Sequence, residues 1–337
     1  MRRPGWSVVI AAVRSFALVA VTALLFLARG PRESSTHPRV RQCGAVPELP
    51  DLTVVSEALH AALADRPIAS AVATAPLAVR GTPGELQALA GQTLTSVGRR
   101  GKFLLFDLSR DRVVVNPMLT GRFQLAAPDA QRPAATALVL SFGPRGDGAA
   151  PERARWTTGA SWLPADGAIV EIRYRDPTQM GKVYLLPTGV DRAVPGMADD
   201  ELGPDADADE LTIESWRERI EPHRGMLKNL LRDQSFVAGL GNAYSDEVLH
   251  AACLLPARSR ASLAPEEIDE LYRAMRRVVE EAQETLRDRV PPTFEKQIRD
   301  FLAVHGHGGS PCPRCGTRIS EIKGGGHITN FCRGCQR

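Results

Sequence analysis

Four cysteines close to the end of the chain constrain its fold more than any other feature. They form two Cys-x-x-Cys pairs, CPRC and CRGC, with 16 residues between them. Each short turn presents two thiolates, and two such turns bind Zn²⁺ tetrahedrally without leaving an open coordination position. The intervening residues, which contain a Lys-Gly-Gly-Gly run, are expected to form a hairpin that closes the site. We therefore expect one structural zinc ion, bound by Cys312, Cys315, Cys332 and Cys335.

The remaining cysteines argue against a disulfide framework. Cys43 and Cys253 are isolated in the sequence, whereas disulfide-rich domains spread their cysteines evenly. Redox cysteines or disulfides are the alternative at the four clustered positions, and the spacing disfavours both. The C-terminal segment is also too small to fold without its metal.

The net charge of the chain conceals a local basic patch. The formal charge is +3, but residues 1–45 hold seven Arg and one Glu, so the rest carries 35 basic and 38 acidic residues. Residues 305–337 are different, because they carry five basic side chains against Glu321: Arg314, Arg318, Lys323, Arg333 and Arg337. Contact with phosphates and an ordinary solvated surface both remain open as interpretations of this patch.

Short β-rich segments fill residues 77–190. They are separated by Gly, Pro and Asp, which favours a β-sandwich or a barrel-like domain. A helix is expected to precede it, because Leu52, Val55, Leu59 and Leu63 have helical spacing. The clearest strand candidates are FLLFDL at 103–108, RVVVNPML at 112–119, ATALVLSF at 135–142 and IVEIRY at 169–174.

The chain becomes helical after an acidic connection. Residues 199–214 hold eight acidic side chains with Gly203 and Pro204, and we interpret them as a linker. Helices are predicted in LTIESWRERI, RGMLKNLLRDQ, AYSDEVLHAACL and residues 264–288. Asn242 is placed to cap the third of these. The last has a regular apolar face, which we assign to core packing.

Residues 1–45 allow two interpretations. A basic start and the apolar run SFALVAVTALLFLA resemble a secretory signal or a membrane anchor. The second interpretation is that translation begins at Val46, whose codon can be GUG, a bacterial start codon. We favour the second interpretation, and we exclude these residues from the argument about the fold.

Four motifs in the remaining sequence resemble one known family. In order they are PELPD, GRRGKFLLFDL, LRDQSFVAGLGNAYSDEVL and PCPRCG…ITNFCRGCQR. They are similar to motifs of the formamidopyrimidine-DNA glycosylase / endonuclease VIII family, and the resemblance extends from Pro47 to Arg337. On its own, Pro47-Glu48 would be ordinary helix-start chemistry. The four motifs occur in the order seen in the family, which argues against a chance resemblance.

The resemblance implies an α+β multidomain fold. Residues 1–45 would be an extension, whether a signal-like segment or the product of a misplaced start. Residues 46–198 would form the catalytic β-sandwich domain with its leading helix. Residues 199–300 would form a helix–two-turn–helix domain, and residues 301–337 a β-hairpin zinc finger.

The resemblance also implies the residues of the site. The amine of Pro47 would be the nucleophile, Glu48 its acidic partner and Lys102 a cation near the phosphate, while His327 stands where the finger's arginine approaches the lesion phosphate. The implied DNA contacts are Lys228, Gly241, Asn242, Gln179 and Met118. Attack on the sugar by a secondary amine gives an iminium ion and then β-elimination. A nitrogen inside a peptide chain cannot do this, which is why we favour a start at Val46.

Three departures from the family pattern affect the reading of the lesion. DPTQMG at 176–181 replaces two arginines by Thr178 and Gln179 and a phenylalanine by Met180. The gap-filling methionine of the family falls at Leu119, with Met118 beside it. His327 is only partly charged near pH 7. We expect DNA binding and lyase chemistry to survive, with a flatter salt dependence and weaker δ-elimination.

The expected partner is double-stranded DNA that contains a damaged base or an abasic site. We expect a monomer without an obligate protein partner, in the cytoplasm beside a bacterial nucleoid. Two alternatives remain open. One is a zinc-dependent DNA-binding protein without catalysis. The other is a membrane-tethered protein, which would require residues 1–45 to be retained.

Overall fold

The computed structural model describes residues 46–146, 151–198, 200–324 and 326–337. The expectations for residues 1–45 therefore lie outside the described residues. Within the described ranges, no helix has both the length and the apolar character that crossing a membrane requires.

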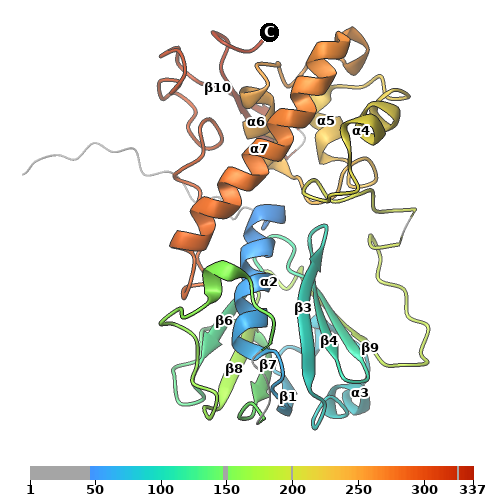
Figure 1. Cartoon of the computed structure of the whole chain (residues 1–337), viewed down its shortest axis with the longest axis vertical. Coiled ribbons are helices and arrows are strands. Elements are labelled where there is room, and N and C mark those ends of the chain that lie inside the picture. Colours follow the sequence, from blue (N-terminus) through green and yellow to red (C-terminus); the bar gives the residue numbers. More distant parts are fainter. Residues whose placement is uncertain (1–45, 147–150, 199, 325) are drawn as a thin grey trace, which may run out of the picture. The chain divides into compact units, whose positions relative to one another are not determined.

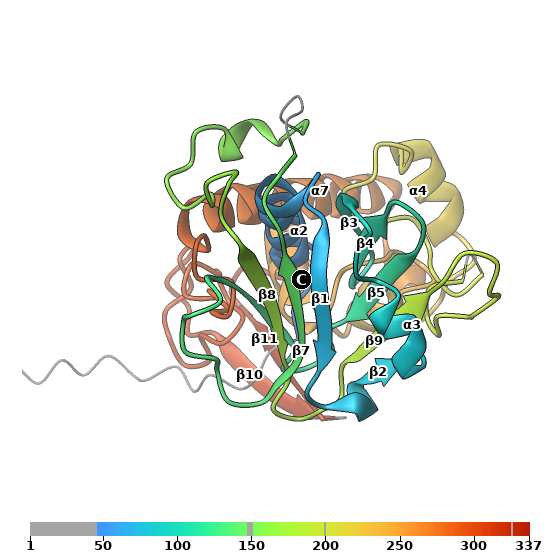
Figure 2. The ribbon, with the colours of Figure 1, turned by 90° about the horizontal axis from the view of Figure 1, so that it is seen from below.

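Two β-sheets face each other in the first half of the described chain (Figures 1 and 2). One has four strands in the order β1-β7-β8-β6, and the other has five in the order β2-β9-β5-β4-β3. The four-stranded sheet contains β1 (Ile68–Ala73), β6 (Arg122–Ala126), β7 (Thr136–Phe142) and β8 (Val170–Arg175). The five-stranded sheet contains β2 (Val79–Arg80), β3 (Leu94–Arg100), β4 (Phe103–Leu108), β5 (Arg112–Asn116) and β9 (Lys182–Leu186). The predicted β-sandwich is confirmed.

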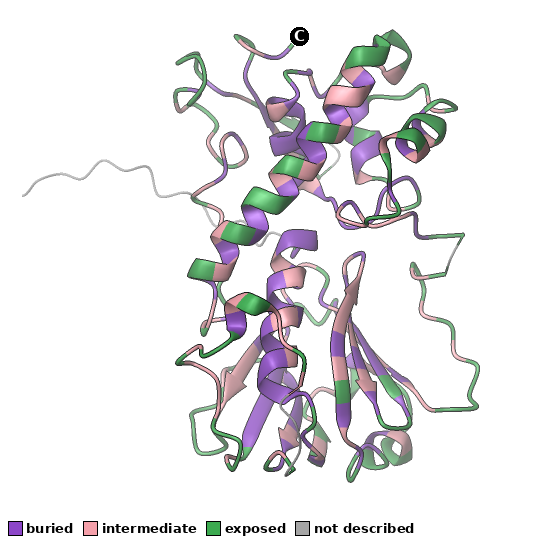
Figure 3. Cartoon of the chain, in the orientation of Figure 1, coloured by how far each residue is buried: buried purple, intermediate pink, exposed green. Residues whose placement is uncertain are grey.

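Helix α2 (Leu49–Leu63) precedes the strands and packs along β3. Most of its residues are buried, which Figure 3 shows along its length. It shares a core with the inner faces of both sheets, through residues such as Leu59, Phe106 and Leu140. Short helical pieces lie in the connections: α3 (Pro83–Gln87) and the 3-10 turns Pro76–Ala78, Arg155–Thr157 and Arg260–Ser262.

Four helices form the second core. They are α4 (Ile213–Ile220), α5 (Leu227–Arg232), α6 (Asn242–Ala251) and α7 (Pro265–Arg289). Trp216, Tyr244 and Leu271 lie at the centre of this core. The buried stripe of α7 alternates with exposed turns in Figure 3, as its amphipathic pattern predicts. Leu286, at the end of α7, packs in the core of the sandwich.

The last element is a two-stranded hairpin, β10 (Ser320–Gly324) and β11 (His327–Phe331). A small apolar cluster of Val304, Ile319, Cys312 and Cys332 lies beneath it. Strand β11 contacts α6, which couples the hairpin to the helical core. The α+β fold with a sandwich, a helical region and a C-terminal hairpin agrees with the sequence prediction.

One local expectation was wrong, and a second segment has contacts that its sequence did not indicate. Asn242 does not cap α6, because the N-cap residue is Gly241 and Asn242 is the first helical residue. The predicted linker has no helix or strand from residue 200 to residue 212, as expected. Part of this segment is nevertheless bound to the sandwich. Asn242 bonds Ile328 and Asp205 bonds Gly101, so both partners lie far away in the sequence.

Candidate functional site

Glu48 is one of the side chains that join the two cores. Its carboxylate accepts hydrogen bonds from three backbone N–H groups at the start of α6: Gly241 at 2.6 Å, Ala243 at 2.9 Å and Tyr244 at 3.2 Å. The first N–H groups of a helix have no partner within it, and the helix dipole favours an anion there. Glu48 is buried. The carboxylate is therefore fixed in position by the turn that precedes α6.

Pro47 is buried directly before Glu48, at the start of α2. It lines a pocket together with Gly121, Arg122 and Gln297. The carbonyl of Val46 accepts a hydrogen bond from Gln297 Nε2 at 3.3 Å. The first turn of α2 is anchored as well, because Asp51 accepts the N–H of Glu48 at 2.8 Å and pairs with Arg299. Pro47 thus lies at the edge of a cavity, beside a fixed carboxylate.

Lys102 approaches Gly241 and Glu48 from the five-stranded sheet. Gly101 and Lys102 form the two-residue turn between β3 and β4, and the φ of Gly101 is 53°, a value that suits glycine. A Cβ atom on Gly241 would lie 2.7 Å from Glu48 Oε1 and 2.9 Å from Lys102 Nζ. Glu48 and Lys102 therefore both approach the backbone of Gly241. Burial lowers the pKa of Lys102, while Glu48 opposes this shift and Arg232 adds to it.

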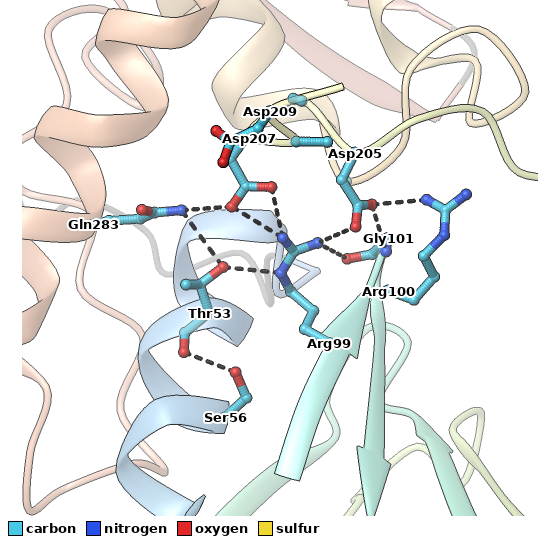
Figure 4. A network of polar contacts seen from close by, with 12 residues as sticks. Thr53, Ser56, Arg99, Arg100, Gly101, Asp205, Asp207, Asp209 and Gln283 are labelled. Atoms are coloured by element: carbon cyan, nitrogen blue, oxygen red, sulfur yellow. Dashed lines mark hydrogen bonds and ion pairs between the residues drawn. The ribbon is translucent and has the colours of Figure 1, made fainter. Parts of the chain in front are cut away.

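The acidic segment fixes the turn that carries Lys102 (Figure 4). Asp205 accepts the N–H of Gly101 at 2.7 Å and pairs with Arg100 at 3.0 Å and Arg99 at 3.2 Å. Asp207 continues the network by binding Arg99 at 2.7 Å. The acidic residues that suggested a linker thus act as acceptors for the Gly-Arg-Arg-Gly stretch.

Replacing Asp205 with alanine is expected to loosen this turn. The change leaves the N–H of Gly101 without its acceptor and removes one of the acceptors of Arg99 and Arg100, which should cost about 1–3 kcal/mol in the free energy of unfolding. Turnover should fall as well, since Lys102 follows Gly101. Thermal unfolding and single-turnover rates would be measured, with Asp209→Ala as the control, because that carboxylate is exposed and lies 3.7 Å from its cation. Equal effects of the two changes would contradict the role of Asp205.

Asn242 and Lys228 connect the helical core to the hairpin. Asn242 Nδ2 donates to the Ile328 carbonyl at 2.8 Å, and its buried Oδ1 has no partner among the described residues. Lys228 is buried, and its Nζ donates to Asp246 at 2.7 Å and to Thr329 Oγ1 at 2.8 Å. Burial lowers the pKa of Lys228, and Asp246 opposes the shift. Its amine is thus enclosed by α6 and β11.

His327 begins β11 and is exposed. Its Nε2 lies 2.6 Å from an Nη atom of Arg232, the last residue of α5. Burial lowers the pKa of His327, and the charges of Arg232 and Lys228 lower it further. The neutral imidazole accepts the guanidinium N–H. The position that the resemblance assigned to a finger arginine thus holds a histidine bonded to an arginine from a helix.

Met118 and Gln179 lie on two neighbouring loops. One loop connects β5 to β6 and the other connects β8 to β9, and β6 pairs with β8 while β5 pairs with β9. Thr120 bonds both Asp176 and Thr178, which ties the loops together. Met118 and Gln179 are exposed and have φ values of 48° and 53°, a region that ordinary residues seldom occupy. The structure therefore presents both side chains at one end of the sandwich.

The four clustered cysteines can hold one metal ion. All four Sγ atoms lie within 4.8 Å of one another. The distances between Cys312 and Cys335 and between Cys315 and Cys332 are 3.8 and 3.4 Å, far longer than the ~2.05 Å of a disulfide. A tetrahedron with Zn–S bonds of about 2.3 Å separates its sulfurs by about 3.8 Å. The set therefore fits a tetrahedral thiolate-bound ion.

Sequence reasoning missed several residues of the site. Arg232 was not singled out, and Asp205 was one acidic residue among eight. Arg299, which anchors the first turn of α2, lies 248 residues from its partner Asp51. No local pattern marks such pairs. Only the position of Arg232 inside a quoted motif could have drawn attention to it.

Comparisons with known proteins agree with this geometry. The family model described as the formamidopyrimidine-DNA glycosylase N-terminal domain matches residues 46–183. The model described as the formamidopyrimidine-DNA glycosylase H2TH domain matches residues 202–290. A formamidopyrimidine-DNA glycosylase of Pelotomaculum thermopropionicum is 32% identical over 302 residues, which are 87% of this chain and 99% of that protein. A relative with the same name from Heliobacterium modesticaldum is 33% identical over 300 residues, 87% of this chain and 100% of that protein.

Solved structures of one such enzyme resemble the fold. The Lactococcus lactis formamidopyrimidine-DNA glycosylase, non-covalently bound to DNA with an abasic site, superposes with a TM-score of 0.69 at 28% identity. That match covers 86% of this chain and 99% of the other. The wild-type enzyme from the same organism, in complex with DNA that contains N7-benzyl-Fapy-dG, gives a TM-score of 0.71 at 28% identity. It covers 86% of this chain and all of the other.

Proposed function

Because the chain belongs to the formamidopyrimidine-DNA glycosylase family, we propose that it is a bifunctional enzyme of base-excision DNA repair. It removes an oxidised base from double-stranded DNA and then cleaves the strand at the abasic site. The observation that carries this proposal is the position of Glu48, which is fixed on the start of α6 directly after Pro47 and near the Lys102 turn.

The proposed nucleophile is the α-amine of Pro47. Its nitrogen attacks the sugar C1′, and the bond to the damaged base breaks with its electron pair leaving on the base. Opening of the sugar ring then gives an iminium ion between Pro47 and C1′. This cation accepts electrons, so the C2′ proton becomes acidic and the 3′ phosphate leaves by β-elimination. A free α-amine has a pKa of about 7.7–8.0, so a useful fraction is unprotonated at neutral pH.

Glu48 and Lys102 support this reaction in the proposed mechanism. Glu48 transfers protons at the oxygen of the opening sugar ring, and its bonds to α6 prevent it from turning away. Lys102 supplies positive charge near the phosphate beside the lesion. Burial lowers its pKa, which lets the same amine also exchange a proton.

The DNA contacts are proposed from the same arrangement. The end of the sandwich that presents Met118 and Gln179 would enter the duplex, where a side chain must fill the gap that an extruded base leaves. Asn242 and the backbone of Gly241 would face the DNA backbone from the helix–two-turn–helix element. Lys228, which is enclosed by Asp246 and Thr329, supports this interface from beneath. The enzyme would act as a monomer.

The proposed metal is one structural Zn²⁺, bound by Cys312, Cys315, Cys332 and Cys335. Four thiolates complete its coordination, so the ion contributes folding energy and takes no part in the reaction. His250 Nε2 lies 3.3 Å from Cys312 Sγ, and a neutral imidazole can donate to that sulfur. Burial, with a contribution from Arg314, lowers the pKa of His250 to about 4.

The mechanism requires Pro47 at the N-terminus of the active polypeptide. A proline nitrogen inside a chain is a tertiary amide and does not attack a sugar. Initiation at the Val46 codon, followed by removal of the initiator methionine, would release the amine. A DNA substrate also places the proposed site of action in the cytoplasm of a bacterium, beside the nucleoid.

Borohydride trapping on a duplex with an abasic site tests the proposal. We expect a polypeptide that begins at Pro47 to form a covalent adduct, because borohydride reduces the iminium ion. The matched control retains Val46 in front of Pro47, and we expect it to form no adduct. Equal adducts from both would show that another nucleophile acts. Tight binding without an adduct from either would favour a DNA-binding protein without catalysis.

A further inference from the structure

We propose that Arg232, held in place by His327, is a direct contact to a phosphate of the DNA backbone at the catalytic site. The inference rests on the proposed function, since it names one more residue of the same DNA interface. It assigns to helix α5 a contact that the resemblance would place on the finger hairpin, where this chain has a histidine instead of an arginine.

The surroundings of Arg232 leave its charge available to a ligand. Its guanidinium bonds His327 Nε2 at 2.6 Å, and no carboxylate pairs with it among the residues that the structure describes. A guanidinium has five N–H donors in a planar fork that matches a phosphate. One bond to an uncharged imidazole fixes the orientation of the fork and leaves other donors unused.

Arg232 also acts electrostatically on the other basic side chains of the site. Its charge lowers the pKa of Lys102, Lys228 and His327, which come from β3–β4, α5 and β11. Lys228 is paired with Asp246, and Lys102 lies close to Glu48 across Gly241. In the part of the chain that the structure describes, Arg232 is therefore the cation of this group without a carboxylate in an ion pair with it or beside it across Gly241. An anion beside Arg232 would pair with its guanidinium.

His327 acts as a positioning residue in this arrangement. It begins β11, which pairs with β10 and contacts α6, so the hairpin supports it. The imidazole accepts from the guanidinium and cannot itself supply the missing positive charge while it is neutral. The resemblance assigns this phosphate contact to one arginine of the finger. Here α5 supplies the positive charge, and the hairpin supplies the side chain that positions it.

An alternative interpretation is that the Arg232–His327 bond only attaches the hairpin to α5. The two interpretations differ in salt dependence, because a phosphate contact releases counterions on binding and an internal bond does not. They also differ in the result expected when the positive charge is moved from position 232 to position 327. Moving it to position 327 would restore a phosphate contact, whereas it would not restore an internal bond that needs both side chains.

The test measures the affinity of the native protein for a duplex with an abasic site over a range of salt concentrations. We expect Arg232→Gln to weaken binding about tenfold and to reduce the slope of log Kobs against log salt by about 0.9. The double variant Arg232→Gln/His327→Arg should recover both. His327→Gln, whose side-chain oxygen still accepts, should lie closer to the wild type than His327→Ala. The control is Arg277→Gln, an exposed arginine of α7 that pairs with Glu270.

Four outcomes are distinguishable. A reduced slope for Arg232→Gln alone, with recovery in the double variant, supports the proposal. A slope for Arg232→Gln equal to that of Arg277→Gln and of the wild type overturns it. A lower affinity for Arg232→Gln at the wild-type slope, without recovery in the double variant, also overturns it, in favour of the attachment role. If the wild type neither prefers the abasic duplex nor forms a borohydride adduct, the proposed function itself fails.

Discussion

Replacing Glu48 with glutamine is expected to reduce base excision by about 10²–10⁴-fold, the usual contribution of a positioned general acid or base. Glutamine has nearly the same shape and can still accept from one N–H group of α6, so the local fold should persist. It cannot transfer the proton that ring opening requires. Single-turnover rates on a duplex with an oxidised base would measure the loss, with binding to an abasic duplex measured in parallel.

Glu57→Gln is the matched control for this change. Glu57 lies on the same helix, and its carboxylate binds Arg287 at 3.0 Å and Trp156 at 2.6 Å, without a contact to Glu48 or to Gly241. We expect its excision rate to equal that of the wild type. An excision rate of the Glu48 variant close to that of the control would remove Glu48 from the mechanism.

Removal of the metal is expected to have the second large effect. The finger has only a small apolar cluster of its own, and structural Zn²⁺ typically supplies about 10–16 kcal/mol of apparent binding free energy in such small domains. A chelator or Cys332→Ser should unfold the hairpin, displace His327 and weaken DNA binding by about 100-fold or more, as expected when several phosphate contacts are lost together. The sandwich and the helical core should remain folded.

Metal content, circular dichroism and DNA affinity would be measured before and after zinc is returned. Cys253→Ser serves as the control, since this exposed cysteine lies outside the cluster. Full DNA affinity in a metal-free preparation would contradict a structural role for the ion. Recovery with zinc, and no effect of the control, would support it.

Local patterns in the sequence predicted much of the fold. The spacing of Leu52, Val55 and Leu59 predicted α2, and the run FLLFDL coincides with β4. Strand β1 was not predicted, because three of its six residues are alanine, which has little preference for strands. The cysteine spacing predicted the metal-binding cluster, because two knuckles need only local geometry.

Contacts between distant segments could not be predicted in this way. The N-terminus of α6 is capped by Glu48, which lies 193 residues before Gly241. Asp205 binds Gly101 across 104 residues, and Arg232 meets His327 across 95. Each contact joins elements that come together only when the sandwich, the helical core and the hairpin pack on one another. The resemblance named some of these residues but not the contacts that position them.

The identity of the nucleophile is the central claim, and one measurement tests it most directly. The native protein would be trapped on an abasic duplex with borohydride, digested, and the DNA-linked peptide identified by mass spectrometry. We predict that the linked peptide begins at Pro47 and carries the adduct on the proline nitrogen. An adduct on Lys102, or on a polypeptide that still contains residues 1–45, would contradict the account.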